Sequence, residues 1–305
     1  MINNYYSFIP VLSDNLDYNR LTENEYILSN ANHKHYLKIN KDVYNLLNLI
    51  DGVKNLKEIS IEYQLKYSKS ISVEEIQILL FERLSIFGIL KGFDEKIKKY
   101  KSPSYLKLGF IIINEKILSK IVKNFYFLFK KRVAFFVILI SITFISTILY
   151  FNFDLYKSFN LQKSLLYYLI ITILSVTFHE IGHATSASYF GAKHGGVGFG
   201  FYLFTPVFYA DVTDIWRLSK NKRIIVNISG IYFEVVFCSI MTLIGCILNN
   251  HALLIIMIIV CLKTLFNLNP FFRSDGYWVL SDLTNKPNLF YHSSEKIKNI
   301  FVFFF

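Results

Sequence analysis

The sequence predicts a mainly α-helical membrane protein, in which a polytopic helical core follows a small α+β domain. Two observations point to this class. Hydrophobic residues make up 53% of the 305 residues, and the mean hydropathy of +0.37 is high for a water-soluble protein of this length. The long uncharged runs all lie after residue 130, whereas the preceding part mixes short apolar stretches with charged residues.

Residues 1–94 are expected to form the α+β domain. Asp14 and Asp17 stand where a signal peptide would carry an apolar run, so this part should stay on the side of the membrane where it is made. Apolar residues within 25–40 flank the turn residues Asn30-Ala31-Asn32, which predicts a two-stranded hairpin.

Three helices should follow the hairpin. Asn40 suits an N-cap, and apolar residues then recur at helical spacing until Gly52 ends the first helix. Residues 56–67 give a second helix. Ser72 begins a third, because Ser72-Val73-Glu74-Glu75 fits the capping-box pattern Ser-x-x-Glu. Residues 87–93 are expected to close the domain as a strand.

Residues 95–132 are predicted to be a basic juxtamembrane linker. Between Lys96 and Arg132 there are eleven Lys and Arg residues and a single acidic one, Glu115. Such a segment next to a membrane span fixes topology and contacts anionic lipid, so membrane lipid is an expected partner. Nucleic acid is not, because the basic run directly precedes a span.

Four spans are expected, at about 133–151, 164–189, 224–249 and 252–282, the last two tilted or interrupted. Basic residues precede the first span and fill the loop between the second and third, which predicts a multi-pass protein with a cytoplasmic N-terminus, in a prokaryotic plasma membrane. The ending Ile300–Phe305 reads as the start of another span. The three cysteines lie within spans and show no disulfide pattern.

The second span ends in His179-Glu180-Ile181-Gly182-His183, the His-Glu-x-x-His pattern. Residues four apart share one face of a helix, so both imidazoles can point at one metal ion, with Glu180 beside them as a general base. A lone histidine on an apolar helix is usually a structural core residue. Three ionisable groups in five residues of a span are costly there and indicate function.

A third ligand is expected from the interrupted fourth span. Pro270 should break that helix, and Gly276 permits an unusual turn. Non-helical backbone is tolerated in a membrane where it lines a cavity. The broken helix can therefore aim Asp275 at the metal.

These motifs together resemble the site-2 protease family of intramembrane zinc proteases. That family carries the His-Glu-x-x-His helix, followed by an Asn-x-x-Pro segment and then Asp-Gly; here Asn267–Pro270 and Asp275-Gly276 match in order over about residues 133–283. The resemblance implies Zn²⁺ held by His179, His183 and Asp275. It also implies that Glu180 is the general base and that Asn267 stabilises the oxyanion, although Asn267 could instead cap a helix beside Pro270.

One motif departs from that family. Many members have Gly-Pro-x-x-Asn on the middle span, whereas this chain has Gly230-Ile231-Tyr232-Phe233-Glu234. Glu234 either takes the place of that Asn as an accessory residue or pairs with Arg217 or Lys263. Residues 205–214 resemble the peptide-maturation branch of the family and read as a strand or re-entrant hairpin that can hold extended substrate. Asp211 and Asp214 within it are expected to be turn residues.

The N-terminal layout of hairpin, three helices and closing strand is that of a small winged-helix domain. Over about residues 20–94, and chiefly in Leu37–Gly52, it resembles the leader-peptide recognition domains of ribosomal-peptide maturation systems. The resemblance implies that a leader adds as an extra strand beside the hairpin, with Tyr36, Lys38 and Leu79 as contacts. A DNA-binding winged helix and a purely structural cap are the alternatives.

The predicted function is hydrolysis of a peptide bond in a ribosomally synthesised precursor peptide by a zinc-dependent intramembrane metalloendopeptidase. Regulated proteolysis of a membrane-anchored signalling protein is the first alternative. A non-proteolytic peptide-binding or export partner is the second, which the intact set of three ligands and a base disfavours.

Overall fold

The computed structural model describes residues 8–30, 32–99, 106–151, 161–202, 205–286 and 289. The chain divides into two compact units, described in turn. Unit 1 comprises Met1–Ser104 and Trp216–Ser219, and unit 2 comprises Tyr105–Ile215 and Lys220–Phe305. The predicted span start at Ile300–Phe305 lies outside the described residues.

Unit 1 contains an antiparallel sheet of three strands in the order β1-β2-β3. The strands are β1 (Leu16–Arg20), β2 (Glu25–Asn30) and β3 (His35–Asn40). The predicted hairpin is confirmed as β2 and β3. Strand β1 was not predicted, because Leu-Asp-Tyr-Asn-Arg carries too few apolar residues to show a strand pattern.

The helices of unit 1 begin where their capping residues predict. The bounds are α1 (Lys41–Leu47), α2 (Leu56–Tyr67) and α3 (Val73–Gln77), with α3 continuing as the π-helix η2 (Ile78–Leu84). The Asn40 side chain accepts from the Val43 backbone N–H at 2.8 Å, and Ser72 and Glu75 form the expected capping box. α1 ends at Leu47, earlier than the predicted end at Gly52.

The predicted closing strand at residues 87–93 is wrong. A short 3₁₀ turn, η3 (Ser85–Phe87), occupies its start, and η4 (Asp94–Lys96) follows it. Gly88 and Gly92 both have positive φ, of 70° and 82°, which bends the backbone out of an extended path. A single antiparallel bridge between Leu12 and Leu90 remains of the expected strand.

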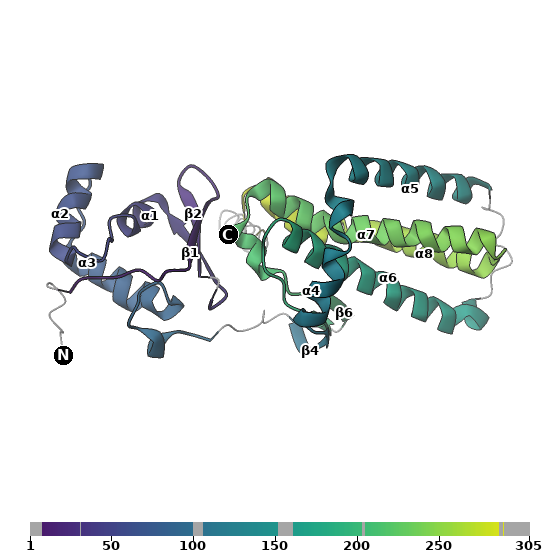
Figure 1. Cartoon of the computed structure of the whole chain (residues 1–305), viewed down its shortest axis with the longest axis horizontal. Helices are drawn as coiled ribbons and strands as arrows, with labels where there is room; N and C mark the ends of the chain where they lie inside the picture. Colours follow the sequence, from purple (N-terminus) through teal and green to yellow (C-terminus); the bar gives the residue numbers. More distant parts are fainter. Residues whose placement is uncertain are drawn as a thin grey trace, which may run out of the picture. The chain divides into compact units, whose positions relative to one another are not determined.

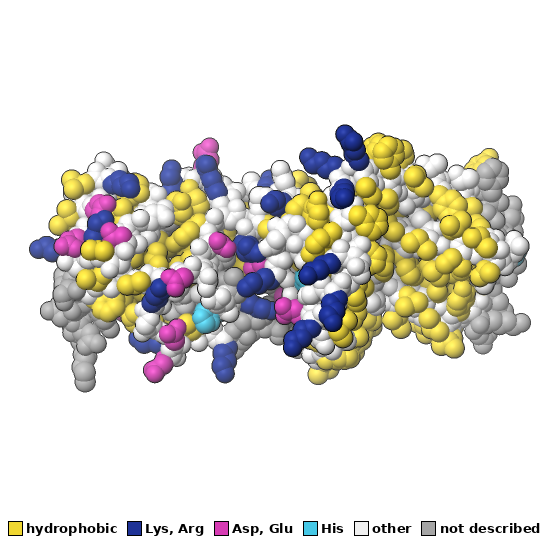
Figure 2. Space-filling model, in the orientation of Figure 1, with side chains coloured by type: hydrophobic (Ala, Val, Ile, Leu, Met, Phe, Trp, Pro, Cys, Tyr) yellow, Lys and Arg dark blue, Asp and Glu magenta, His cyan; other side chains and the backbone are white. Residues whose placement is uncertain are grey.

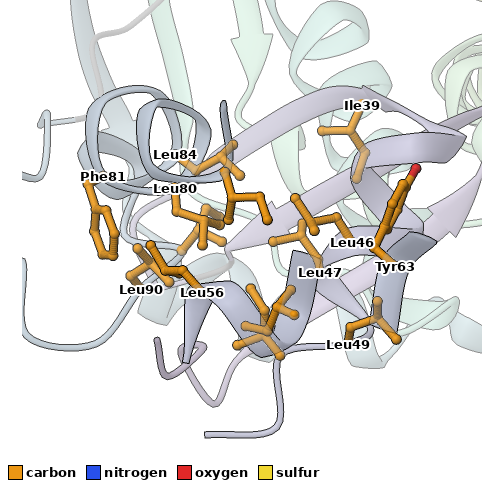
Figure 3. Close-up of a cluster of buried hydrophobic side chains, with 14 of the residues drawn as sticks. Ile39, Leu46, Leu47, Leu49, Leu56, Tyr63, Leu80, Phe81, Leu84 and Leu90 are labelled. Atoms are coloured by element: carbon orange, nitrogen blue, oxygen red, sulfur yellow. The ribbon is translucent and has the colours of Figure 1, made fainter. Parts of the chain in front are cut away.

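A compact apolar core holds unit 1 together (Figure 3). Its side chains come from the sheet and all the helices, so the unit has the organisation of a water-soluble domain. The labelled members are Ile39, Leu46, Leu47, Leu49, Leu56, Tyr63, Leu80, Phe81, Leu84 and Leu90.

Unit 2 is dominated by long helices that run side by side (Figure 1). Their bounds are α5 (Lys131–Phe151), α6 (Leu161–Tyr189), α7 (Lys220–Ile247), α8 (His251–Phe266) and α9 (Asp275–Leu283). Helix α7 is central, packing against α5, α6, α8 and α9. Among the described residues, three helices are long and apolar enough to cross a membrane: Lys131–Ile148, Ser164–Tyr189 and Lys220–Ile247.

The predicted fourth span is not one continuous helix. The expected interruption near Pro270 is confirmed, because α8 ends at Phe266 and α9 begins at Asp275. Helix α8 has 16 residues, or about 24 Å of rise, which is short of the roughly 30 Å hydrocarbon core.

A second three-stranded sheet belongs to unit 2. It has the antiparallel order β4-β5-β6, formed by β4 (Leu106–Ile113), β5 (Val197–Tyr202) and β6 (Thr205–Ala210). The predicted strand near residue 205 is confirmed as β6, whereas β4 was not foreseen. It lies in the stretch described above as a linker, together with α4 (Glu115–Lys123) and η5 (Tyr126–Phe129). The 3₁₀ turn η7 (Thr213–Arg217) follows β6.

The surface of unit 2 is apolar over its long helices. Figure 2 shows hydrophobic side chains covering α5–α8 on the visible face, with Lys and Arg side chains near α4 and the start of α5. Leu166 is 71% exposed on α6, and Ile247 is 70% exposed on α7. Such a surface suits a lipid environment, in agreement with the three apolar helices.

Candidate metal centre

Two imidazoles from α6 meet inside unit 2. His179 and His183 are buried, and their Nε2 atoms lie 3.1 Å apart. The four-residue spacing places both rings on one face of the helix, as predicted.

The other ring nitrogen of each histidine has a partner on α7. The Nδ1 atom of His183 donates to the backbone carbonyl of Val226 at 2.8 Å, and Nδ1 of His179 lies 3.2 Å from a carboxylate oxygen of Glu234. Both partners are acceptors, so each neutral ring carries its proton on Nδ1. The two Nε2 atoms therefore present lone pairs toward one another.

Asp275, which is the first residue of α9, completes the cluster. Its Oδ2 lies 3.1 Å from Nε2 of His179, and its Oδ1 lies 3.3 Å from Nε2 of His183. One ligand atom from each of the three residues lies within 4.8 Å of the others. Oδ2 is buried and has no hydrogen-bond donor among the described residues.

This arrangement fits a metal ion. Two nitrogen lone pairs and a carboxylate converge with no proton between them, which is repulsive unless a cation occupies the centre. Two imidazoles and one carboxylate are a donor set that zinc takes at catalytic sites, where a fourth position stays open. The structure thus brings together the three residues that the sequence predicted as ligands.

Two glycines allow the helices to approach closely at this centre. A Cβ on Gly230 of α7 would lie 2.4 Å from Nε2 of His183 and 2.5 Å from Nε2 of His179. A Cβ on Gly182 of α6 would lie 2.5 Å from the backbone oxygen of Ser229. These close contacts of Gly182 and Gly230 were not predicted, because the sequence around a glycine in an apolar helix does not indicate which other helix packs against it.

The turn before α9 aims Asp275 at the histidines. Asn267 is the C-cap of α8, and its carbonyl accepts from the Gly276 N–H at 2.8 Å. A Cβ on Gly276 would lie 2.0 Å from the Leu268 carbonyl oxygen, so this close approach requires glycine. The hydroxyl of Ser274 donates to the Asn269 carbonyl at 2.6 Å and closes the turn.

Glu180 is buried next to the cluster. Its carboxylate accepts a backbone hydrogen bond from Ala210, the last residue of β6. The residue predicted as the general base thus lies between the histidine pair and the end of an edge strand.

The segment after β6 contains Asp211, which accepts from the Thr213 hydroxyl at 2.8 Å, and Asp214, which accepts from the Lys193 N–H at 2.6 Å. Asp211 has the predicted turn role, whereas Asp214 is buried and binds the backbone of a segment 21 residues earlier in the chain.

Glu234 lies behind His179 and is fully buried. It accepts from the Ser175 hydroxyl at 2.7 Å, and Lys263 Nζ lies 3.7 Å away, which confirms the predicted pairing with Lys263. The Asn267 side-chain amide donates to it at 3.5 Å. Glu234 therefore contacts a candidate ligand and the predicted oxyanion residue at once.

The candidate leader contacts belong to unit 1. Tyr36 and Lys38 lie on β3, which is an edge strand of the β1-β2-β3 sheet, and Leu79 lies in η2. Lys38 Nζ forms a 2.6 Å ion pair with Glu25 on β2.

Comparison with known proteins gives one informative match. No protein-family profile matches the chain, and no solved structure does. The chain is 31% identical over 214 residues to the Bacillus subtilis (strain 168) protein named "Putative peptide zinc metalloprotease protein YydH", covering 63% of this chain and 82% of that protein. The match spans most of that relative, and His179, His183 and Asp275 form a centre with the donor types that zinc takes. The chain therefore belongs to the same family of zinc metalloproteases as this relative.

Proposed function

We propose that the chain is an intramembrane endopeptidase of the site-2 protease type, which cleaves a ribosomally synthesised precursor peptide. The observation that carries the proposal is the cluster of Asp275 with the buried His179 and His183, with the buried Glu180 beside it. Ionisable groups are rare among membrane-spanning helices, and where they occur they mark function. The name of the B. subtilis relative supports a peptide as the substrate.

The side chains supply the remaining parts of a hydrolytic site. His179, His183 and Asp275 would hold the zinc ion, which would supply Lewis acidity for the activation of water and the polarisation of the scissile carbonyl. Glu180 takes a proton from the attacking water and returns it to the leaving amine, so that a carboxylate and an amine are the products. Asn267 donates its side-chain amide to the oxygen that becomes negatively charged.

Extended substrate would bind along β6. This strand is at the edge of the β4-β5-β6 sheet, and its last residue, Ala210, bonds to Glu180. A peptide that adds as a strand exposes its carbonyls, which a helical peptide does not. Strand addition would thus deliver a scissile bond next to the general base.

The N-terminal unit would select the substrate. A leader peptide would add as a strand beside β3, an edge strand of the β1-β2-β3 sheet, with Tyr36 and Lys38 on that strand and Leu79 on η2 as contacts. In this proposal, unit 1 is a winged-helix domain that binds the leader, and unit 2 cleaves the peptide.

Peptide cleavage by the purified full chain in detergent tests the proposal. The probe is a pool of short ribosomally made peptides from the host cell, and mass spectrometry identifies new N-termini. We expect new termini with the native protein and none with Glu180→Gln or after zinc removal. The exposed Glu82→Gln serves as the matched control. Identical termini with Glu180→Gln would contradict the proposal, and cleavage confined to membrane-anchored proteins would favour the regulatory alternative.

The membrane orientation has its own test. Single cysteines replace Glu23, Asn160, Lys193 or His251 in a chain lacking the three native cysteines, and intact cells are treated with a membrane-impermeant thiol reagent. A cytoplasmic N-terminus predicts labelling at positions 160 and 251 only. Labelling at position 23 or 193 would overturn this orientation.

A further inference from the structure

The third ligand stands on a short helix of unit 2. Helix α9 has nine residues, and Asp275 is the first of them, directly after the turn that interrupts the fourth predicted span. Short helices are marginal on their own and depend on tertiary contacts. Something other than α9 itself must hold Asp275 at the histidines.

A buried ion pair ties the far end of α9 to α7. Arg223 is 1% exposed, and its Nε and Nη2 atoms lie 2.8 and 2.6 Å from Oδ1 of Asp282. The side-chain amide of Asn227 donates to Oδ2 of Asp282 at 3.3 Å. Both carboxylate oxygens of Asp282 are thus bound from α7. In addition, Lys220 Nζ donates to the Leu283 carbonyl at 3.0 Å, at the C-terminus of α9.

The same face of α7 holds the histidines. Arg223, Asn227, Gly230 and Glu234 recur at intervals of four, three and four residues, which places them in one row along the helix. Gly230 provides the space for both Nε2 atoms, and Glu234 contacts His179. On α9, Asp275 and Asp282 are seven residues apart, so they also share a face. The same face of α7 therefore contacts His179 and also anchors α9, the helix that carries Asp275.

We propose that Arg223, Asn227 and Asp282 form a positioning clamp, which fixes the orientation of α9 and thereby the position of Asp275 at the metal. The proposal rests on the function proposed above. A buried ion pair can also be merely structural, and the net stabilisation from such a pair is small relative to well-packed apolar residues. The two roles differ in what they change. The clamp sets zinc affinity through Asp275 alone, whereas a structural pair sets only the stability of the fold.

Zinc affinity of the full chain in detergent, measured by competition with a chromogenic chelator, tests the clamp. Asp282→Asn removes the charge and leaves an amide facing Asn227. We expect about 10–100-fold weaker zinc binding, as for other residues that orient a metal ligand. In the Asp275→Ala background, Asp282→Asn should cause no further loss, because its effect passes through Asp275.

A stability control separates the two roles. Leu253→Ala removes a 1% exposed side chain from the α7–α8 core and should lower thermal stability while zinc affinity stays unchanged. If Asp282→Asn does not fold, Asn227→Ala decides instead, with an expected loss of roughly 2–10-fold from a single hydrogen bond.

Two results would overturn the clamp: native zinc affinity in the folded Asp282→Asn or Asn227→Ala variant, or losses that add with Asp275→Ala. A native chain that binds no zinc would instead overturn the proposed function, and the clamp with it.

Discussion

The two units differ in which side chains they bury. Among the described residues, the buried polar side chains of unit 1 are Ser29, Asn30 and Ser85, none of which is ionisable. The described part of unit 2 buries eight His, Asp, Glu and Arg side chains, namely His179, Glu180, His183, His194, Asp214, Arg223, Glu234 and Asp282. Unit 1 follows the rule for water-soluble proteins, with an apolar interior. Unit 2 combines an apolar surface with an interior that holds ionisable groups between its apolar clusters.

This contrast separates structural from functional burial. Burying a charged group costs free energy unless it is paired, and in a lipid surrounding the alternative of exposure is also costly. In unit 2, four of these groups, His179, Glu180, His183 and Glu234, lie together with Asp275, and Arg223 pairs with Asp282. In unit 1, the side chains of Ser29, Asn30 and Ser85 bond to the backbone, as where the Asn30 amide donates to the Gly88 carbonyl at 2.6 Å. Substitutions of the ionisable groups around the histidines should therefore change chemistry, whereas core substitutions in unit 1 should change stability alone.

The largest expected effect is on catalysis. Glu180→Gln keeps the three ligand residues and removes the general base, so turnover should fall by roughly 10²–10⁴-fold. Zinc content, measured by atomic absorption on the purified protein, should be unchanged. Native turnover in this variant would show that the buried carboxylate next to the histidines is structural, and the contrast between the units would fail.

The next effect belongs to unit 1 and concerns stability. Leu47 is fully buried in its core, so Leu47→Ala should lower the free energy of unfolding of that unit by about 2–5 kcal/mol. Chemical denaturation followed by hydrogen exchange of unit 1 measures the loss. Zinc affinity should stay native, and a zinc affinity that falls with unit 1 stability would contradict the separation of roles.

The residues predicted correctly are those tied to local sequence patterns. His179 and His183 follow from a spacing of four, and the helix starts at Asn40 and Ser72 follow from capping chemistry. Asp275 was predicted as the third ligand, and its placement at the histidines depends on the break near Pro270.

What was missed depends on contacts between distant segments. Strand β4 becomes a strand by pairing with β5, about ninety residues later in the chain. Arg223 and Asp282 looked like ordinary loop or helix-end charges, and only the packing of α9 on α7 brings them together. Gly230 carries no sequence signal at all, since its role comes from a helix crossing.

Gly230→Ala tests the difference between the two units at an uncharged position of unit 2. The added methyl group would stand where both Nε2 atoms meet, and crowding of this kind costs roughly 1–3 kcal/mol. We therefore expect zinc affinity to fall by about 5–150-fold while unit 1 keeps its stability. Gly245→Ala, also on α7 but beside Leu254 of α8, is the matched control and should keep native zinc affinity. Equal affinity in both variants would refute the close approach at Gly230.

The smallest expected effect is the loss of an exposed ion pair in unit 1, which we compare with the loss of the buried ion pair in unit 2. Lys38 and Glu25 lie 2.6 Å apart, with side chains 39% and 33% exposed. Water and salt screen such pairs, so Glu25→Gln should change the free energy of unfolding by less than about 1 kcal/mol. Removing one partner of the buried Arg223–Asp282 pair leaves an uncompensated charge and should cost about 3–5 kcal/mol. Denaturant titrations of Glu25→Gln and Asp282→Asn at low and high salt measure both losses, and only the exposed pair should respond to salt. If the two variants lose the same free energy with the same salt dependence, the interior of unit 2 is as well solvated as the surface of unit 1, and its buried charges need no functional explanation.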